Sequence, residues 1–354
     1  MFLQSPVSPG DCKKKFNINF MKKLFTFSLI AISFVSVSSA NSGFQHRPLI
    51  EEYTGLWCQW CPRGHVALEM IDERYGEDQV SISYHVTDAM AVTETFVINV
   101  SGVPVATVDR GPRIDPYYGE TEREDFAISH NIEEAMAQES PVGIEVAAKK
   151  IGNKIDITTH VEFAEDIDKA NYQIGYVLTC SGLSSPSWRQ MNEYSSYNGK
   201  DTFKDTPLEP LTEESVYIRN MVFDHVAVDV SGMRGVNGSL PSSVKAGEIY
   251  EHTYSFNNID KNALIQDPDR LEVAAFVIDK STGKIVNSNK YSFNIPQSPE
   301  DENAVKGVVY ESEVTDVEYF DLTGSRVLSP SKGIFIQREI KSDGTVHTSK
   351  KLFN

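Results

Sequence analysis

The sequence contains 354 residues, with 33 Lys or Arg against 50 Asp or Glu and a formal net charge of −17 at pH 7. Such an acidic chain disfavours nucleic acid and anionic membrane faces as partners, so we expect no nucleic-acid partner. Its length is too great for one small domain and predicts two domains followed by a tail.

Residues 21–40 have the composition of a bacterial-style signal peptide. Met21 is followed by two lysines, an apolar run over 24–35 and small residues that end at Ala40. The run is too short to span a membrane comfortably, and no later segment approaches that length. Because 1–20 lie awkwardly upstream of a complete signal, we place translation start at Met21 rather than Met1. We expect an exported protein, in the periplasm or at the outer membrane or cell surface.

Cleavage after residue 40 would remove five basic residues and one acidic residue, leaving a formal charge of −21. We therefore expect the mature chain to be soluble or peripherally attached to the outer membrane.

A strand, a cysteine pair, a helix and a second strand are predicted between residues 47 and 86. Residues 47–55 are partly β-prone and end at a glycine, and 80–86 alternate between apolar and polar residues. Between them, Pro62 fits the first turn of a helix, because its missing N–H would have no helical partner there. The apolar face of that helix is formed by Ala67, Met70, Ile71 and Tyr75, and Gly76 ends it.

Cys58 and Cys61 stand where this predicted helix begins. A helix N-terminus stabilises a thiolate through its dipole and free N–H groups, and the thiolate is the attacking species in disulfide exchange. Two alternatives remain beside a redox role. In an oxidising compartment the pair can be a purely structural disulfide. A metal site with His65 lacks a fourth ligand, so we expect neither a metal nor a cofactor.

Residues from about 47 to 138 resemble a thioredoxin-like domain, in which the same order of elements surrounds a Cys-X-X-Cys. The resemblance implies that Cys58 is the nucleophile and Cys61 the resolving thiol. It also implies that Glu52, six residues before Cys58, is the buried acid that shuttles a proton to the second cysteine. Gln59-Trp60 departs from the Gly-Pro of thioredoxin, which leaves the direction of the redox reaction open.

The same resemblance implies where a substrate chain docks. Pro104 follows Cys61 by 43 residues, near the position of the thioredoxin cis-proline. The Val103–Pro104 bond is then expected to be cis and to face the disulfide. We assign Trp57 and Trp60, together with Val103 and Pro104, to substrate binding.

Residues 141–296 are expected to form an antiparallel β-sandwich, immunoglobulin-like in type. A hairpin is predicted over 142–148 and 155–161 around Gly152-Asn153. Further strands are predicted at 172–180, 216–223, 248–256, 271–278 and 284–294. The polar stretch 182–214 is interpreted as a long surface loop, Cys180 as an inert core thiol, and His225 as part of a strand or its edge.

The chain ends with a predicted linker, 297–306, and a β tail, 307–354. The tail resembles the type IX secretion sorting domains of Bacteroidetes. Residues 53–64, the segment containing Trp188-Arg189-Gln190, and this tail together resemble the outer membrane protein 28-related family. That resemblance implies a location at or near the outer membrane rather than a particular chemistry.

The sequence as a whole predicts an α+β multidomain protein. We expect a thioredoxin-like domain at 41–140, a β-sandwich at 141–296 and a short β tail. The functional hypothesis is a thiol–disulfide oxidoreductase that acts on protein thiols or disulfides of the cell envelope. The alternative is a non-enzymatic binding or adhesion protein at the outer membrane with a structural disulfide.

Overall fold

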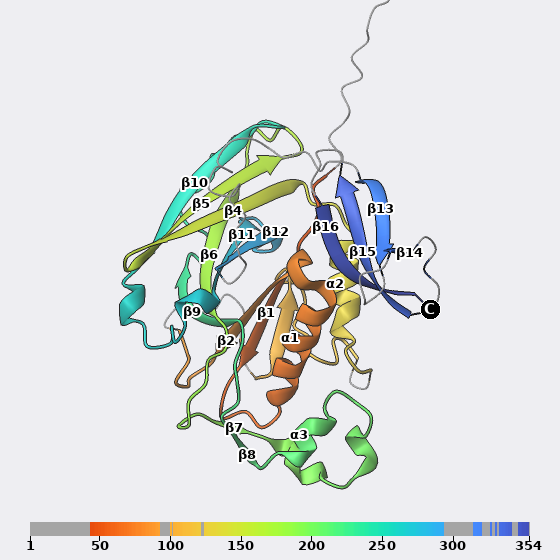
Figure 1. Cartoon of the computed structure of the whole chain (residues 1–354). Coiled ribbons are helices and arrows are strands. Elements are labelled where there is room, and N and C mark those ends of the chain that lie inside the picture. The colour runs from red at the N-terminus through yellow and green to blue at the C-terminus, as the bar shows by residue number, and fades with distance from the viewer. Residues whose placement is uncertain are drawn as a thin grey trace, which may run out of the picture. The chain divides into compact units, whose positions relative to one another are not determined.

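The computed structural model describes residues 43–92, 100, 102–121, 124–293, 314–320, 326–327, 330, 333–341 and 346–353. The chain is mostly β, with strands in several sheets and few helices, in agreement with the predicted α+β class (Figure 1). Within these ranges, no helix combines the length and the apolar character needed to cross a membrane. The predicted signal peptide at 21–40 and the linker at 297–306 lie outside the described residues.

The helical elements are α1 (Pro62–Tyr75), η1 (Gly76–Asp78), α2 (Ile128–Met136), η2 (Glu193–Tyr197), η3 (Asp201–Phe203), α3 (Glu209–Glu213), η4 (Ile259–Lys261) and η5 (Pro268–Arg270). The strands are β1 (Leu49–Thr54), β2 (Val80–His85), β3 (Val105–Val108), β4 (Val142–Ile151), β5 (Lys154–Phe163), β6 (Tyr172–Cys180), β7 (Arg189–Met191), β8 (Tyr217–Arg219), β9 (Val226–Ser231), β10 (Ile249–Asn257), β11 (Leu271–Asp279), β12 (Ile285–Ser292), β13 (Val314–Phe320), β14 (Arg326–Val327), β15 (Gly333–Lys341) and β16 (Val346–Phe353).

A seven-stranded sheet in the order β12-β11-β6-β9-β2-β1-β3 organises the chain. β1 and β2 are parallel, and β2 also pairs in parallel with β9 through Ser83 and Val226. The remaining neighbours are antiparallel. Strands from both sides of residue 140 therefore share one sheet, while the expected domain boundaries stay a prediction.

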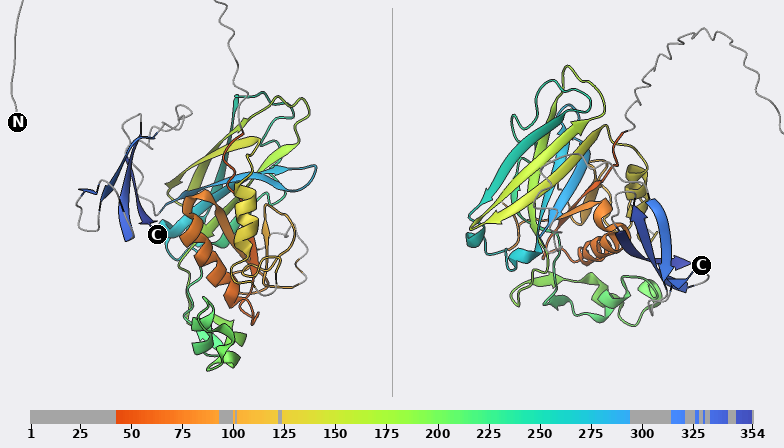
Figure 2. Two further views of the ribbon diagram at one scale, coloured as in Figure 1. Left: turned by 90° about the vertical axis from the view of Figure 1, so that its right-hand side faces the viewer. Right: turned by 45° about the horizontal axis from the view of Figure 1, so that its top comes forward.

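One face of this sheet is covered by two different kinds of element (Figures 1 and 2). α1 and α2 cover β1 and β3, where Ile50 packs with Leu68 and Ile71 of α1. The three-stranded sheet β10-β5-β4 covers β6, β9 and β11. The partners Ser83 and Val226 point to the same side, so helices and small sheet lie side by side on one face.

The opposite face contains a buried ion pair. Apolar residues of β1, β2, β6 and β11 form most of this face. Glu51 lies among them with no exposed surface, and Arg110 donates to it from Nε at 2.9 Å and from Nη2 at 3.2 Å. The Arg110 guanidinium also lies over the ring of Phe276. The attraction between the two charges offsets part of the cost of burying them.

Most of the predicted elements are confirmed. β1, β2, the helix beginning at Pro62 and the β4–β5 hairpin lie where the sequence placed them, and the predicted strand 172–180 has the bounds of β6. Gly76 ends α1 with a positive φ of 50°, a conformation that glycine adopts without strain. β3, α2 and β9 were not predicted. His225 directly precedes β9, at the strand edge as expected.

The prediction of a surface loop at 182–214 is wrong. This stretch contains β7, two 3-10 helices and α3, and β7 pairs with β8. Tyr194 and Leu208 are buried here in one cluster with Ala67 of α1. The polar composition of the stretch concealed this packing, because the apolar partners come from a distant part of the sequence.

The tail consists of a four-stranded antiparallel sheet in the order β14-β13-β15-β16. Its likeness to a sorting domain stays a prediction.

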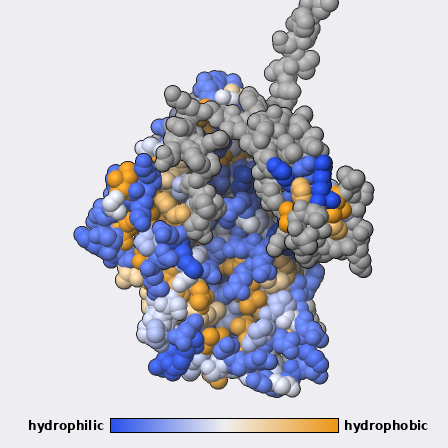
Figure 3. Space-filling view, viewed as in Figure 1, coloured by the Kyte–Doolittle hydropathy of each residue, from blue (hydrophilic) through white to orange (hydrophobic). Residues whose placement is uncertain are grey.

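The face of the molecule in Figure 3 is largely hydrophilic with scattered hydrophobic residues, as the acidic composition leads one to expect.

Replacement of Arg110 by Met tests the buried pair. The variant leaves Glu51 buried without its cation, and we expect the free energy of unfolding to fall by about 3–5 kcal/mol at pH 7. Urea unfolding measures this loss. Arg74→Met is the matched control, because the Arg74–Glu133 pair is about half exposed (52% and 45%). That change is expected to cost less than about 1 kcal/mol, and equal losses would contradict the prediction.

Candidate active site

The two cysteines form a disulfide at the start of α1. Cys61 is the N-cap residue of the helix and Pro62 occupies its first position, as the sequence predicted. Backbone hydrogen bonds from Cys58 to Gly55 and from Cys61 to Cys58 close two successive turns around the pair. The positive end of the helix dipole therefore lies beside both sulfur atoms.

The two cysteines differ in their exposed fraction. Cys58 is 5% exposed, whereas Cys61 has no exposed surface. Cys58 Sγ lies 3.3 Å from the carbonyl oxygen of Val103, and the Val103–Pro104 peptide bond is cis, as expected. Trp57 is 49% exposed and donates from Nε1 to the carbonyl of Val86 at 2.8 Å. The half-exposed Trp57 ring and the Val103–Pro104 segment thus both lie close to Cys58.

Glu52 lies beneath the first turn of α1, and Gly64 leaves the space for it. A Cβ atom on Gly64 would lie 1.9 Å from Glu52 Oε1. The carboxyl has no exposed surface, accepts one hydrogen bond from the Ser83 hydroxyl at 3.0 Å, and has no partner for Oε1 in the described part of the chain. Burial raises the pKa of Glu52 from its ordinary 4.5 to about 7.

The adjacent residues Glu51 and Glu52 lie in different environments, because successive side chains of a strand point to opposite faces of the sheet. Their side chains point to opposite faces of β1, so that Glu51 reaches Arg110 while Glu52 faces α1. Only Glu52 lacks a direct ion pair, and it is the carboxyl placed under the helix that begins at Cys61. This position fits the proton-transfer role that the resemblance implied, which stays a prediction.

A second buried polar group lies at the end of β2. His85 has no exposed surface and its Nδ1 lies 2.8 Å from Asp88, which also accepts a hydrogen bond from the backbone of Leu56. His65 of α1 stacks with His85 at a ring separation of 6.3 Å. Burial lowers the pKa of His65 to about 3, so the ring is neutral. No group of three or more metal-ligating side chains occurs among the described residues.

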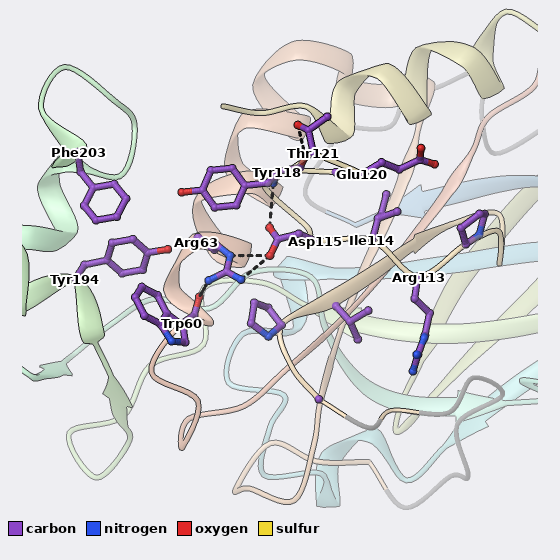
Figure 4. Close-up of a pocket in the computed structure, with 15 residues that line it drawn as sticks. Trp60, Arg63, Arg113, Ile114, Asp115, Tyr118, Glu120, Thr121, Tyr194 and Phe203 are labelled. Carbon is purple, nitrogen blue, oxygen red and sulfur yellow. Dashed lines mark hydrogen bonds and ion pairs between the residues drawn. The ribbon is translucent and has the colours of Figure 1, made fainter. Parts of the chain in front are cut away.

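A groove of about 870 Å³ is lined by Trp60, which lies between the two cysteines in the sequence (Figure 4). Pro104 also lines it, together with Tyr194 of η2 and Phe203 of η3 from the segment after β7. In Figure 4, Tyr194 and Phe203 lie on the same side of the groove as Trp60. Trp60 meets Tyr194 edge-on at 5.5 Å. The groove is thus built from both the cysteine-bearing part of the chain and the stretch that the sequence had suggested was a loop.

Arg63 forms the polar base of this groove. Its guanidinium binds Asp115 through Nε at 2.8 Å and lies over the rings of Trp60 and Tyr118. Asp115 in turn accepts hydrogen bonds from the backbone of Tyr117 and Tyr118 at 2.9 Å. The charges in the groove base are therefore paired, and its aromatic side chains are held in place.

The residues around β7 also hold the cysteine loop, which the sequence did not reveal. Gln190 donates from Nε2 to the carbonyl of Cys58 at 2.8 Å. The backbone N–H groups of Met191 and Glu193 donate to Leu56 and Gln59, each at 2.9 Å. No local pattern announces these contacts, because they join residues more than 130 positions apart. Cys180 is buried, as expected, and burial raises the pKa of its thiol.

Replacement of Gly64 by Ala tests the position of the Glu52 carboxyl. At an exposed helical site this change would stabilise the helix by about 1 kcal/mol. Here the new methyl group meets the carboxyl, and we expect a loss of about 1–3 kcal/mol in the free energy of unfolding. Glu52→Ala in the same chain should remove the clash. Urea unfolding of both single variants and the double variant measures the coupling, and additive losses would contradict it.

The raised pKa of Glu52 predicts a pH dependence of stability. The folded protein holds this proton more tightly than the unfolded chain, so the free energy of unfolding falls as the pH rises from about 4.5 to about 7. The loss from this carboxyl is about 3 kcal/mol. Glu52→Gln should abolish that part of the decline and unfold at higher urea concentration than the parent at pH 8. Parallel pH profiles for the two proteins would refute the assignment.

Comparison with known proteins places the chain in a family. The sequence model described as Outer membrane protein Omp28 matches residues 91–297. These residues begin after the two cysteines, so the match does not include Cys58 or Cys61. No curated protein matches significantly.

Two solved structures are similar to this chain over much of its length. HBP35 of Porphyromonas gingivalis is 18% identical, with 88% of this chain and 100% of that chain covered and a TM-score of 0.48. Protein AGR_C_4864 from Agrobacterium tumefaciens is 16% identical, with 71% and 96% covered and a TM-score of 0.38. The family match spans more than half of the sequence and points to an envelope or surface location. The chain therefore belongs to the outer membrane protein Omp28 family.

Proposed function

We propose that this protein is an exported thiol–disulfide oxidoreductase with a thioredoxin-like domain, acting on proteins of the cell envelope through Cys58 and Cys61. The observation that carries the proposal is the disulfide at the N-terminus of α1 with Glu52 buried under the same helical turn. A helix N-terminus stabilises the thiolate, and a carboxyl with a pKa of about 7 accepts or returns a proton near neutral pH.

The reaction is a pair of thiol–disulfide exchanges. The Cys58 thiolate attacks one sulfur of a client disulfide, which forms a mixed disulfide and releases the other client sulfur as a thiolate. Cys61 gives its proton to Glu52 and attacks Cys58 Sγ, which restores the Cys58–Cys61 disulfide and releases the second client thiolate. Two electrons pass to the client, and the same steps in reverse oxidise a client dithiol.

Client binding is assigned to the surface around Cys58. Trp57 offers a half-exposed ring directly before the nucleophile, and Val103 and Pro104 lie on its other side. The groove lined by Trp60, Pro104 and Phe203 has a volume of about 870 Å³ and is the site to which we assign part of the client chain. Peripheral association with the outer membrane would place this surface among envelope proteins.

The second candidate function is a binding or adhesion protein with a structural disulfide. The slight exposure of Cys58 and the complete burial of Cys61 favour this alternative. A structural bridge of this kind has a reduction potential below about −300 mV, whereas redox-active pairs lie higher. The two candidate functions therefore predict different reduction potentials for the Cys58–Cys61 pair.

Trapping of the mixed disulfide tests the enzyme. Reduced Cys61→Ser protein, incubated with a disulfide-bonded model protein, should accumulate a covalent complex on a non-reducing gel, because the resolving thiol is absent. Cys58→Ser is the control and should form none. Absence of the complex with Cys61→Ser, together with a potential below about −300 mV for the unaltered protein, would support the structural disulfide instead.

A further inference from the structure

Residues 190–193 bind the backbone of the cysteine loop along its length. Gln190 Nε2 donates to the carbonyl of Cys58 at 2.8 Å and lies 3.4 Å from that of Gly55. Met191 and Glu193 donate backbone N–H groups to the carbonyls of Leu56 and Gln59. Four of the five carbonyls from Gly55 to Gln59 thus accept a hydrogen bond from one short segment that is remote in sequence. In Figure 1, β7 lies close to the first turn of α1, in agreement with these contacts.

Gln190 is the side chain at the centre of this arrangement. It has no exposed surface, and its Nε2 is surrounded by the carbonyl oxygens of Gly55, Cys58 and Met191, the last at 3.0 Å. Three acceptors around one atom fix which end of the amide is nitrogen. Gln190 Oε1 is buried without a partner among the described residues, which costs free energy.

We propose that Gln190 is a positioning residue that raises the reduction potential of the Cys58–Cys61 pair, an inference that rests on the proposed redox function. The amide directs its positive end at the Cys58 carbonyl, and this favours a negative charge on the adjoining Cys58 sulfur. Because the thiolate exists only in the reduced protein, the donor stabilises the dithiol form over the disulfide. The segment after β6 thereby influences chemistry that takes place near the N-terminus of α1.

The equilibrium with glutathione measures this effect. Two molecules of reduced glutathione convert the Cys58–Cys61 disulfide to the dithiol and become one molecule of oxidised glutathione. In Gln190→Met the side chain keeps its length and loses the donor, so the dithiol should be disfavoured. We expect the equilibrium constant for reduction to fall about 10-fold, which corresponds to about 30 mV.

Asn192 provides the matched control. This residue is also buried in the same segment, and its Nδ2 donates to the carbonyls of Leu211 and Ser215 rather than to residues 55–59. Asn192→Leu should lower the melting temperature and leave the equilibrium constant unchanged. Gln190→Glu, which replaces the donor by a carboxylate of the same size, should lower the constant further than Gln190→Met. It also keeps the inference testable if Gln190→Met does not fold.

The possible outcomes separate the inference from the proposed function. A lowered constant in the Gln190 variants alone supports the positioning role. Constants equal to that of the parent, or an equal shift in Asn192→Leu, overturn it while the enzyme stands. If the unaltered protein does not exchange with glutathione at any ratio of its two forms, the proposed redox function fails, and the positioning role fails with it.

Discussion

The parallel pairing of β2 with β9 is the constraint on which the rest of the structure depends. The Ser83 backbone donates to the carbonyl of His225 at 2.8 Å, and Ser83 faces Val226 across the two strands. The contact is supported by an ion pair between His225 and Asp72 of α1 at 2.5 Å. The pairing joins β1 and β2 to the strands that follow residue 140, and the carboxyl ends of β1 and β2 lie at one edge of the sheet. The cysteine loop begins at that edge, and residues 190–193 meet it there.

At the candidate site, β1 carries two buried carboxyl groups, one with a direct cation partner and one without. Glu51 has the Arg110 guanidinium as a direct partner at 2.9 Å. Glu52, its neighbour, receives a single hydroxyl and no direct cation, so burial dominates and moves the pKa of the carboxyl toward neutrality. A carboxyl of the second kind is unfavourable for stability and useful for proton transfer. This carboxyl lies under the first turn of α1, the helix whose N-cap is Cys61.

Local patterns were sufficient for the elements that carry the cysteines. Pro62 and Gly76 mark the two ends of α1, and the turn at Gly152 defines the β4–β5 hairpin. Proline narrows the range of φ values that the backbone can adopt and glycine widens it, whatever residues surround them. The run of residues 172–180 itself predicted β6 with the correct bounds. Alternation in sequence also indicated which side of β6 carries Cys180.

Long-range partners were beyond the reach of such patterns. The ion pair of Glu51 spans 59 positions and the hydrogen bond from Gln190 to Cys58 spans 132. A lone glutamine between Arg189 and Met191 has no local signature, since the carbonyl that it meets lies 132 positions away in the sequence. The polar stretch before β8 appeared to be a loop for the same reason.

Gly64 has a consequence for the recognition of related chains. Glu52 stands six residues before Cys58 and Gly64 six residues after it, and the two positions share one volume of space. Relatives that keep the acid are expected to keep the glycine, whereas those that lose the acid are free to fill the vacancy with alanine or serine. If Glu52 transfers a proton as we propose, joint occurrence of the two residues around a Cys-X-X-Cys marks the chains that share this role.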